Sequence, residues 1–258
     1  RLCYSGEVFR YDEPGEKSSR EFHQLGIEQI GSAGLSADVE VLLIAVELLG
    51  ALGIKDFRIT LSHVDFFKGL AEALKIDDGS RRKLRDLIDR RNAAALAEFL
   101  ENNAPQMSAE RRDSFCKLTQ IGGKKEALER ASETLRNETS RVAIGQLASI
   151  FELVSQLGFE EYFDIDFGDA AGLEYYSGLT FKVFVAGIGF EIGSGGRYDN
   201  LLSSFGAAEP AVGFSFNLDG LVEAATRNGL QPEVELHEEL PASNENLADL
   251  FRRALAIR

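Results

Sequence analysis

Three side chains of an expected strand, residues 21–30, could together hold a small amine or an imidazole ring. Side chains alternate between the two faces of a strand, so Gln24, Gly26 and Glu28 share one face. Glu28 would supply negative charge, Gln24 a directional hydrogen bond, and Gly26 room for close approach of a ligand. The same alternation is typical of a solvated strand face, and that alternative stays open for this segment taken alone.

Two glycine-containing segments could complete such a site. Tyr175 and Tyr176 lie between Gly172 and Gly178, and their rings and hydroxyls could wall a pocket. Residues 193–197 read Gly-Ser-Gly-Gly-Arg, and a glycine run at the end of a strand lets backbone approach a ligand closely. No lysine followed by serine or threonine closes this run, so it is not a phosphate-binding P-loop. Edge packing and a tight turn are the alternative interpretations.

No metal and no cofactor is expected. The three histidines, His23, His63 and His237, lack the spacing of metal ligands. Cys3 and Cys116 are far apart and form no Cys-x-x-Cys pair, so neither a zinc site nor a disulfide framework is indicated. We expect both thiols to be reduced.

Length and composition indicate a folded protein with a full core. The chain has 258 residues, of which 44% are hydrophobic, and it contains no apolar run long enough to cross a bilayer. Its formal net charge of -14 disfavours nucleic acid as a partner, because grip on a polyanion needs concentrated lysine and arginine. We expect a cytoplasmic protein that binds neither nucleic acid nor membrane.

The elements that must position these residues follow from hydrophobic periodicity and turn signals. Strands are expected at residues 2–9, 21–30, 57–61, 162–167, 179–185, 188–192 and 211–216. A helix is expected from Ser36 as N-cap to Gly50, and further helices throughout residues 62–158, with caps at Ser80 and Ser108. A helix at about residues 218–227 and a last one at residues 244–257 complete the set.

This order of elements predicts an α+β fold. Hairpins, then helices, then more hairpins do not alternate as a parallel sheet requires, so an antiparallel sheet flanked by helices fits better. We assign residues 1–61 and 159–228 to the core, residues 62–158 to a mostly helical insertion, and residues 229–258 to a linker and C-terminal helix.

Four segments resemble, in order and spacing, those of histidyl-tRNA synthetases and of their paralogue, the regulatory subunit of ATP phosphoribosyltransferase. Residues 9–12 with 22–28 are similar to class II motif 2, and residues 172–178 resemble the Arg-Gly-Leu-Asp-Tyr-Tyr-Thr-Gly histidine motif. Residues 195–199 match Gly-Gly-Arg-Tyr-Asp, and residues 211–221 look like motif 3. The resemblance covers about residues 1–225 and implies the class II synthetase fold.

The resemblance also implies a histidine pocket. Its residues would be Arg10, Gln24, Gly26, Glu28, Tyr175, Tyr176, Gly195, Gly196 and Arg197. Two arginines of the synthetases are replaced, by Ala171 before the tyrosine motif and by Gly220 in motif 3. Activation of an amino acid with ATP needs cations at the phosphates, and loss of one such group costs about 10² to 10³ in rate. We therefore expect a kept histidine site beside a degenerate ATP site.

That combination resembles the non-catalytic regulatory subunit, with no catalytic residues of its own. The resemblance implies a short-form catalytic subunit of ATP phosphoribosyltransferase as partner, histidine as feedback inhibitor of the first step of histidine biosynthesis, and self-dimerisation within a hetero-oligomer. The chain opens at Arg1 rather than a methionine, and only a short tail follows residue 227, so we expect a missing N-terminal part and no anticodon-binding domain. A catalytic-core fragment of a histidyl-tRNA synthetase and an assembly scaffold that binds no histidine are the alternatives.

Overall fold

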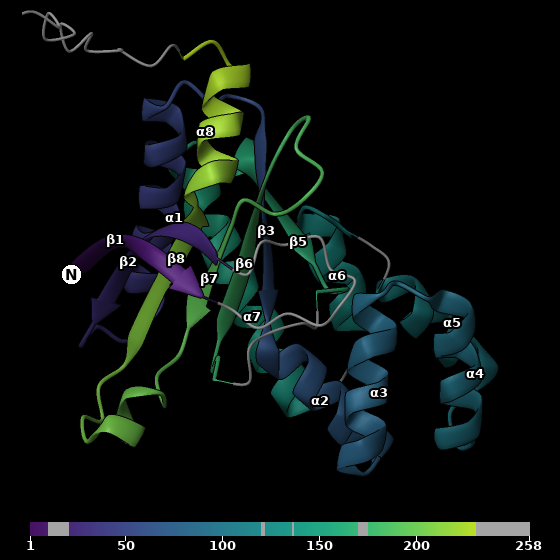
Figure 1. Cartoon of the computed structure of the whole chain (residues 1–258). Coiled ribbons are helices and arrows are strands. Elements are labelled where there is room, and N and C mark those ends of the chain that lie inside the picture. The colour runs from purple at the N-terminus through teal and green to yellow at the C-terminus, as the bar shows by residue number, and fades with distance from the viewer. Residues whose placement is uncertain (10–20, 120–121, 136, 170–174, 231–258) are drawn as a thin grey trace, which may run out of the picture.

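The structure, a computed structural model, describes residues 1–9, 21–119, 122–135, 137–169 and 175–230 (Figure 1). Eight strands in these ranges form one sheet in the order β1-β2-β8-β7-β6-β3-β5-β4. The strands are β1 (Leu2–Phe9), β2 (Glu21–Ile30), β3 (Phe57–His63), β4 (Gly122–Gly123), β5 (Phe163–Asp166), β6 (Leu179–Val185), β7 (Gly193–Arg197) and β8 (Ala211–Asn217). The expected strands are confirmed except at residues 188–192.

The helices within the described ranges also follow the expected order. They are α1 (Leu35–Ala51), α2 (Val64–Leu74), α3 (Asp78–Asp89), α4 (Ala93–Asn103), α5 (Ala109–Leu118), α6 (Lys125–Thr134), α7 (Glu138–Gln156) and α8 (Leu218–Arg227), with short 3-10 turns at Glu160–Tyr162 and Leu202–Phe205. None of them has the length and hydropathy to cross a membrane. The expected helix at residues 244–257 and the hairpin loop between β1 and β2 lie outside the described residues.

The sheet is antiparallel except at one pair. β3 and β5 run parallel, because the helical segment between them carries the chain back to the end of the sheet at which β3 began. The hairpin expected from residues 179–185 and 188–192 is wrong in its second strand. Its partner strand is β7, the glycine run itself, which pairs with both β6 and β8. Residues 188–192 form the connection, which buries Ile192 in the core.

Two helix boundaries differ from expectation, because cap signals compete within a few residues. Gly34 precedes α1 and Ser36 lies inside it without a side-chain capping bond, while the helix ends at Ala51 rather than Gly50. Ser80 lies inside α3, where its backbone N–H donates to the true cap, Asp77. The expected cap at Ser108 is confirmed, since its hydroxyl accepts from the N–H of Arg111.

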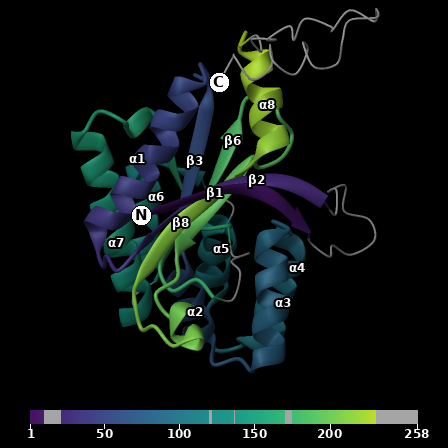
Figure 2. The same ribbon diagram turned by 60° about the vertical axis from the view of Figure 1, so that its left-hand side comes forward.

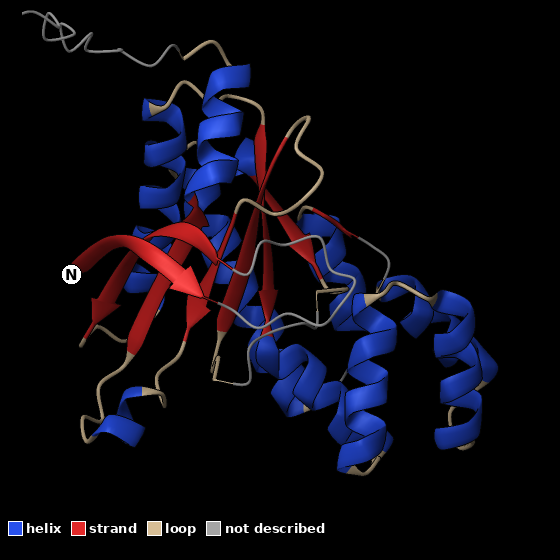
Figure 3. Cartoon of the chain, viewed as in Figure 1, coloured by secondary structure: helices blue, strands red, loops and turns tan. Residues whose placement is uncertain are grey.

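Different helices lie on the two sides of the sheet. α1 and α7 lie on one side and α3 and α4 on the other (Figure 2). The first side carries the apolar core, including Phe163, Phe181 and Phe216, all at most 1% exposed. Helices α3 to α5 form an all-helical part at the lower right of Figure 3, whereas α6 contacts β4 and β5, and α7 contacts α1 and β3. The expected helical insertion thus includes two helices, α6 and α7, that pack against strands of the sheet.

Candidate ligand-binding site

Across β2, β8 and β7, three residues lie side by side on the face turned away from α1. Glu28 is paired with Gly213, and Gly213 with Gly196, so all three share one face of the sheet. A side chain at Gly213 would collide with the carboxylate of Glu28. A Cβ at Gly196 would lie 2.9 Å from the ring of Tyr176. The glycines therefore form a floor that lets Glu28 and Tyr176 lie flat against the sheet.

The carboxylate of Glu28 is partly buried next to a hydroxyl. Its Oε2 accepts a hydrogen bond from the hydroxyl of Tyr198, which follows β7 directly. Burial raises the pKa of Glu28, and the Tyr198 hydrogen bond opposes that rise without cancelling it. Among the described residues, no lysine, arginine or histidine forms an ion pair with this carboxylate. Glu28 is thus a partly desolvated anion with hydroxyl neighbours and no described counter-charge.

Three more tyrosines surround Glu28. The rings of Tyr175 and Tyr176 lie with centroids 4.6 Å apart, and Tyr175 meets Tyr198 edge-on at 5.8 Å. Tyr4 comes from β1, where it is paired with Gly26. Burial and the nearby Glu28 charge raise the pKa of Tyr4, and burial and neighbouring tyrosines raise that of Tyr176. The pKa of Tyr198 is raised as well, by burial and by Glu28, so the hydroxyls of Tyr4, Tyr176 and Tyr198 stay protonated at neutral pH and can donate or accept hydrogen bonds.

Gln24 and Gly26 extend this face along β2, as the alternation predicts. The Nε2 of Gln24 donates to the hydroxyl of Tyr4 at 3.1 Å. The ring of Tyr4 lies over Gly26 so closely that any Cβ at position 26 would overlap it. Gly26 provides room for a tyrosine of the neighbouring strand, which in turn forms part of the wall beside Glu28.

Two of the expected pocket residues lie on the opposite face. β7 alternates, so Gly195 and Arg197 face α1 and the core, where a Cβ on Gly195 would meet Phe181 at 2.7 Å. The Nε of Arg197 donates to Asp38 of α1 at 2.8 Å and its Nη1 to Asp199 at 2.9 Å. Arg197 is 7% exposed, and it also donates to the backbone carbonyl of Gly34. The guanidinium of Arg197 is therefore bound by groups of the protein itself, and it connects α1 to β7.

Three expected positions remain, one in the histidine pocket and two in the degenerate ATP site. Arg10 and Ala171 lie outside the described residues. Gly220 is buried in the first turn of α8, where its N–H donates to the side chain of Asn217 at 2.9 Å. A Cβ there would lie 3.1 Å from Ile192 and 3.5 Å from the ring of Phe190. Gly220 thus contributes close packing and no charge.

The cations that β3 and β6 place on the polar face are paired within the protein. Lys182 lies 3.1 Å from Asp169 and 3.4 Å from Glu191, and Arg58 lies 3.8 Å from Asp164. Burial alone would lower the pKa of Lys182, but the two carboxylates raise it. The two carboxylates keep Lys182 occupied, so it is not preorganised to hold a polyphosphate, whereas the half-exposed Arg58 is only loosely paired.

Sequence reasoning named six residues that the structure brings together, Gln24, Gly26, Glu28, Tyr175, Tyr176 and Gly196, and it missed Tyr4 and Tyr198. The signal for Tyr198 lies in the Gly-Gly-Arg-Tyr-Asp segment, because alternation from Gly196 puts residue 198 on the same face. Tyr4 carries no comparable signal, since its place depends on the register between β1 and β2.

This arrangement suits a small cationic or hydrogen-bonding ligand. A carboxylate on a glycine floor, with phenol rings and hydroxyls around it, can pair with an ammonium or imidazole N–H and cover it with aromatic faces. Within the described ranges, no group of three or more His, Cys, Asp or Glu side chains is placed to hold a metal ion.

Comparison with known proteins places the chain in a family. The family model described as histidyl-tRNA synthetase matches residues 1–221. The chain belongs to this family. The expected fold, an antiparallel class II-like sheet flanked by helices, is confirmed by a solved structure from Bacillus halodurans described as an ATP phosphoribosyltransferase regulatory subunit/histidyl-tRNA synthetase. The TM-score is 0.78 at 28% identity, over 87% of this chain and 58% of that one.

Two curated relatives carry the name ATP phosphoribosyltransferase regulatory subunit. The one from Geobacter sulfurreducens is 36% identical over all of this chain and 58% of its own length. The one from Clostridium kluyveri is 32% identical over all of this chain and 66% of its own length. This member of the synthetase family therefore spans about three-fifths to two-thirds of the length of these relatives.

Proposed function

We propose that the chain is a non-catalytic regulatory subunit of ATP phosphoribosyltransferase that binds free histidine next to Glu28. The observation that carries the proposal is the partly buried Glu28 carboxylate, which has tyrosine hydroxyls around it and no described counter-charge. Histidine offers an imidazole N–H and an ammonium group, which suit such an acceptor. The name of the curated relatives supports the regulatory role.

The proposed partner is the short-form catalytic subunit. In this assembly the present chain self-associates, activates its partner, and transmits feedback inhibition by histidine in the first step of histidine biosynthesis. Such regulation requires histidine to bind the inhibited and active assemblies with different affinities, a coupling of roughly 1 to 3 kcal/mol. The proposal places the chain in the cytoplasm together with this biosynthetic assembly.

Reconstitution tests this function directly. The full chain is mixed with a short-form catalytic subunit, and the initial rate is measured with and without histidine, with light scattering to follow assembly. We expect activation on mixing and inhibition by histidine. The Glu28→Gln variant should still activate but should lose inhibition. Absence of activation by the wild-type chain would refute the regulatory role, whereas activation that histidine does not change would leave only a scaffold.

The family model favours a second candidate, a catalytic-core fragment of a histidyl-tRNA synthetase. Gly220 has no side chain where the synthetases have an arginine, and Lys182 is engaged by Asp169 and Glu191. Both features count against ATP activation. Exchange of pyrophosphate into ATP that depends on histidine would support the synthetase and count against the regulatory subunit.

A further inference from the structure

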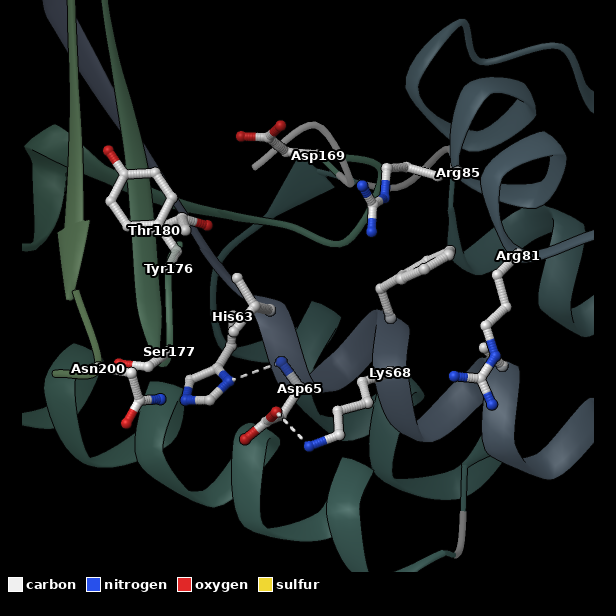
Figure 4. Close-up of a pocket in the computed structure, with 13 residues that line it drawn as sticks. His63, Asp65, Lys68, Arg81, Arg85, Asp169, Tyr176, Ser177, Thr180 and Asn200 are labelled. Atoms are coloured by element: carbon white, nitrogen blue, oxygen red, sulfur yellow. Dashed lines mark hydrogen bonds and ion pairs between the residues drawn. The ribbon is translucent and has the colours of Figure 1, made fainter. Parts of the chain in front are cut away.

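The first turn of α2 is held by a histidine side chain. His63 ends β3 and is the N-cap of α2. Its Nδ1 accepts a hydrogen bond from the backbone N–H of Asp65 at 3.2 Å, as Figure 4 shows. The other helices of the described ranges that have a side-chain cap use aspartate, asparagine or serine, at Asp77, Asn92, Ser108, Asn137 and Asn217. Among these capped helices, α2 is therefore the one whose acceptor is lost in the pH range where histidine titrates.

The same ring also binds α7. Its Nε2 lies 2.5 Å from the Oε1 of Gln146. A neutral imidazole has one donor and one acceptor nitrogen, and Nδ1 already accepts, so Nε2 carries the proton and donates to Gln146. This contact connects the start of α2 to α7, which packs on α1 and β3. One neutral tautomer therefore satisfies both hydrogen bonds, and no other protonation state of the ring does.

His63 lies between two cavities. The side chain is 3% exposed, and it lines both a cavity of about 390 Å³ beside α2 and α3 and one of about 650 Å³ between α1 and α7. Asp65 and Ser177 line both cavities as well, so these three residues form the partition between them. The backbone N–H of Val64 donates to the carbonyl of Gly178 at 3.1 Å, which also ties the start of α2 to the segment before β6.

The charged side chains near the ring are mostly paired with one another. Those that line either cavity are Asp38, Asp65, Lys68, Arg81, Arg85, Asp169, Arg197 and Asp199. The side chains that α7 and β6 place beside the ring, Gln146 and Leu179, are uncharged. Burial lowers the pKa of His63 below its ordinary value of 6.5, and the Gln146 hydrogen bond and the Asp65 charge oppose that shift without cancelling it. The neutral ring is therefore the favoured form in the folded chain.

We propose that His63 is a pH-sensitive latch that holds the first turn of α2 against α7. The neutral ring caps α2 and binds Gln146. When the ring takes up a proton, Nδ1 becomes a donor and the Asp65 N–H loses its acceptor. The first turn of α2 then opens and the two cavities join. The latch goes beyond the proposed function, because it acts within this chain and needs neither histidine as a ligand nor a partner subunit.

The direction of the pH effect follows from linkage. The ring binds a proton more weakly when it is latched than when it is exposed, so the open form gains as pH falls below 6.5. Opening should increase up to about tenfold for each pH unit, until the latched ring is itself protonated. At higher pH the ring is neutral in both forms, and opening should not depend on pH.

Amide hydrogen exchange of the full chain, without histidine or a partner, tests the latch. Protection of the Asp65 amide, corrected for the intrinsic pH dependence of exchange, should fall about tenfold per pH unit below 6.5. The amide of Ser140, which donates to its cap Asn137 at 2.8 Å, is the control in the same sample and should show no such slope. A flat profile at Asp65, or an equal slope at both amides, would overturn the proposal.

A pair of variants tests whether His63 is the titrating group. His63→Asn replaces the cap by a residue that also accepts from a helix N–H but does not titrate in this range. Protection of the Asp65 amide should then be independent of pH after the same correction. His23→Asn, the matched change at an exposed histidine of β2, should keep the wild-type slope. A wild-type slope in His63→Asn would mean that another group titrates and would overturn the proposal.

Nitrogen NMR of the unaltered chain, labelled at histidine, provides a test that requires no variant to fold. The chemical shifts of the two ring nitrogens distinguish the neutral tautomers. We expect His63 to be the Nε2–H tautomer at neutral pH and to titrate below 6.5. An Nδ1–H tautomer, or a titration midpoint above the ordinary value for histidine, would overturn the proposal.

Discussion

Glu28, which is partly buried, and Asp38, which is buried, are carboxylates on opposite sides of the same sheet, and they differ in what surrounds them. Asp38 lies in the first turn of α1, 2.7 Å from the Nη2 of Arg197. Glu28 accepts a hydrogen bond from a phenol and has no described cation. Burial raises the pKa of both carboxyls; Arg197 opposes the rise at Asp38, and only the Tyr198 hydroxyl opposes it at Glu28.

The presence or absence of a counter-charge distinguishes a carboxylate that stabilises the fold from one that is suited to bind a ligand. A buried charge with a complete set of partners holds elements together, and its removal is costly because the partner is left uncompensated. A partly desolvated charge without a counter-charge is unfavourable for the isolated protein, and such groups concentrate at binding sites. Asp38 and Arg197 therefore stabilise the fold, and the surroundings of Glu28 support the ligand-binding role proposed for it.

The largest effect is expected from Arg197→Met. This change leaves Asp38 buried without its cation, and loss of one partner of a buried pair lowers the free energy of unfolding by about 3 to 5 kcal/mol. Urea denaturation followed by circular dichroism measures the change. The double variant Asp38→Asn with Arg197→Met is the control, because it removes both charges and should recover part of the loss. A stability equal to wild type in the single variant would contradict the structural role.

Glu28→Gln should produce the opposite pattern, with affinity lost and stability kept. A hydrogen bond to a charged group contributes about 1.5 to 3 kcal/mol, so histidine should bind about 10- to 150-fold more weakly. Titration calorimetry measures the affinity, and urea denaturation should show no loss of stability. Glu21→Gln, the same change at the exposed start of β2, serves as control. Unchanged affinity in Glu28→Gln would remove this residue from the site.

The fold could be predicted from the sequence because strand and helix periodicities are local. The glycine run was the exception. Residues 188–192 alternate like a strand, with apolar side chains at Ile188, Phe190 and Ile192. β7 reads Gly-Ser-Gly-Gly-Arg, a composition that weakens strand propensity. The packed structure explains why the strand is rich in glycine, because Phe216 and Tyr176 occupy the space where side chains on Gly193 and Gly196 would lie. Tertiary crowding therefore outweighs local propensity at this strand.

The site residues that share one face of a single strand could be predicted from the alternation of side chains along that strand. A residue that reaches the site through the pairing of two strands could not, because the sequence does not specify the pairing register. Gln24, Gly26 and Glu28 follow from one strand alone. Tyr4 reaches the site through its pairing with Gly26 across β1 and β2, and no sequence pattern specifies that pairing. Alternation within β7 also separates Arg197 from Gly196, which the resemblance to a single motif had grouped together.

Tyr198→Phe should have a smaller effect than Glu28→Gln. It removes one hydroxyl that orients the Glu28 carboxylate and leaves the ring in place, so histidine should bind about three- to tenfold more weakly, or roughly 1 kcal/mol. Calorimetry again measures the affinity. Tyr162→Phe is the matched control, because Tyr162 stacks on Phe57 at the other end of the sheet. An equal loss in both variants would indicate a general effect on stability rather than a role at the site.

The smallest effect is the pH dependence that Glu28 gives to stability. Burial raises the pKa of Glu28 in the folded chain, so the folded state holds this proton more tightly than the unfolded state. The ionised carboxylate therefore lowers stability at neutral pH, and this cost disappears as pH falls through the raised pKa toward the unfolded value. Glu28→Gln lacks the charge, so its advantage over the wild-type chain should be greatest at neutral pH and shrink on acidification. Urea denaturation of both proteins without histidine, across that range, measures the difference. A gap that widens on acidification would mean that Glu28 has a counter-charge, and the contrast with Asp38 would be lost.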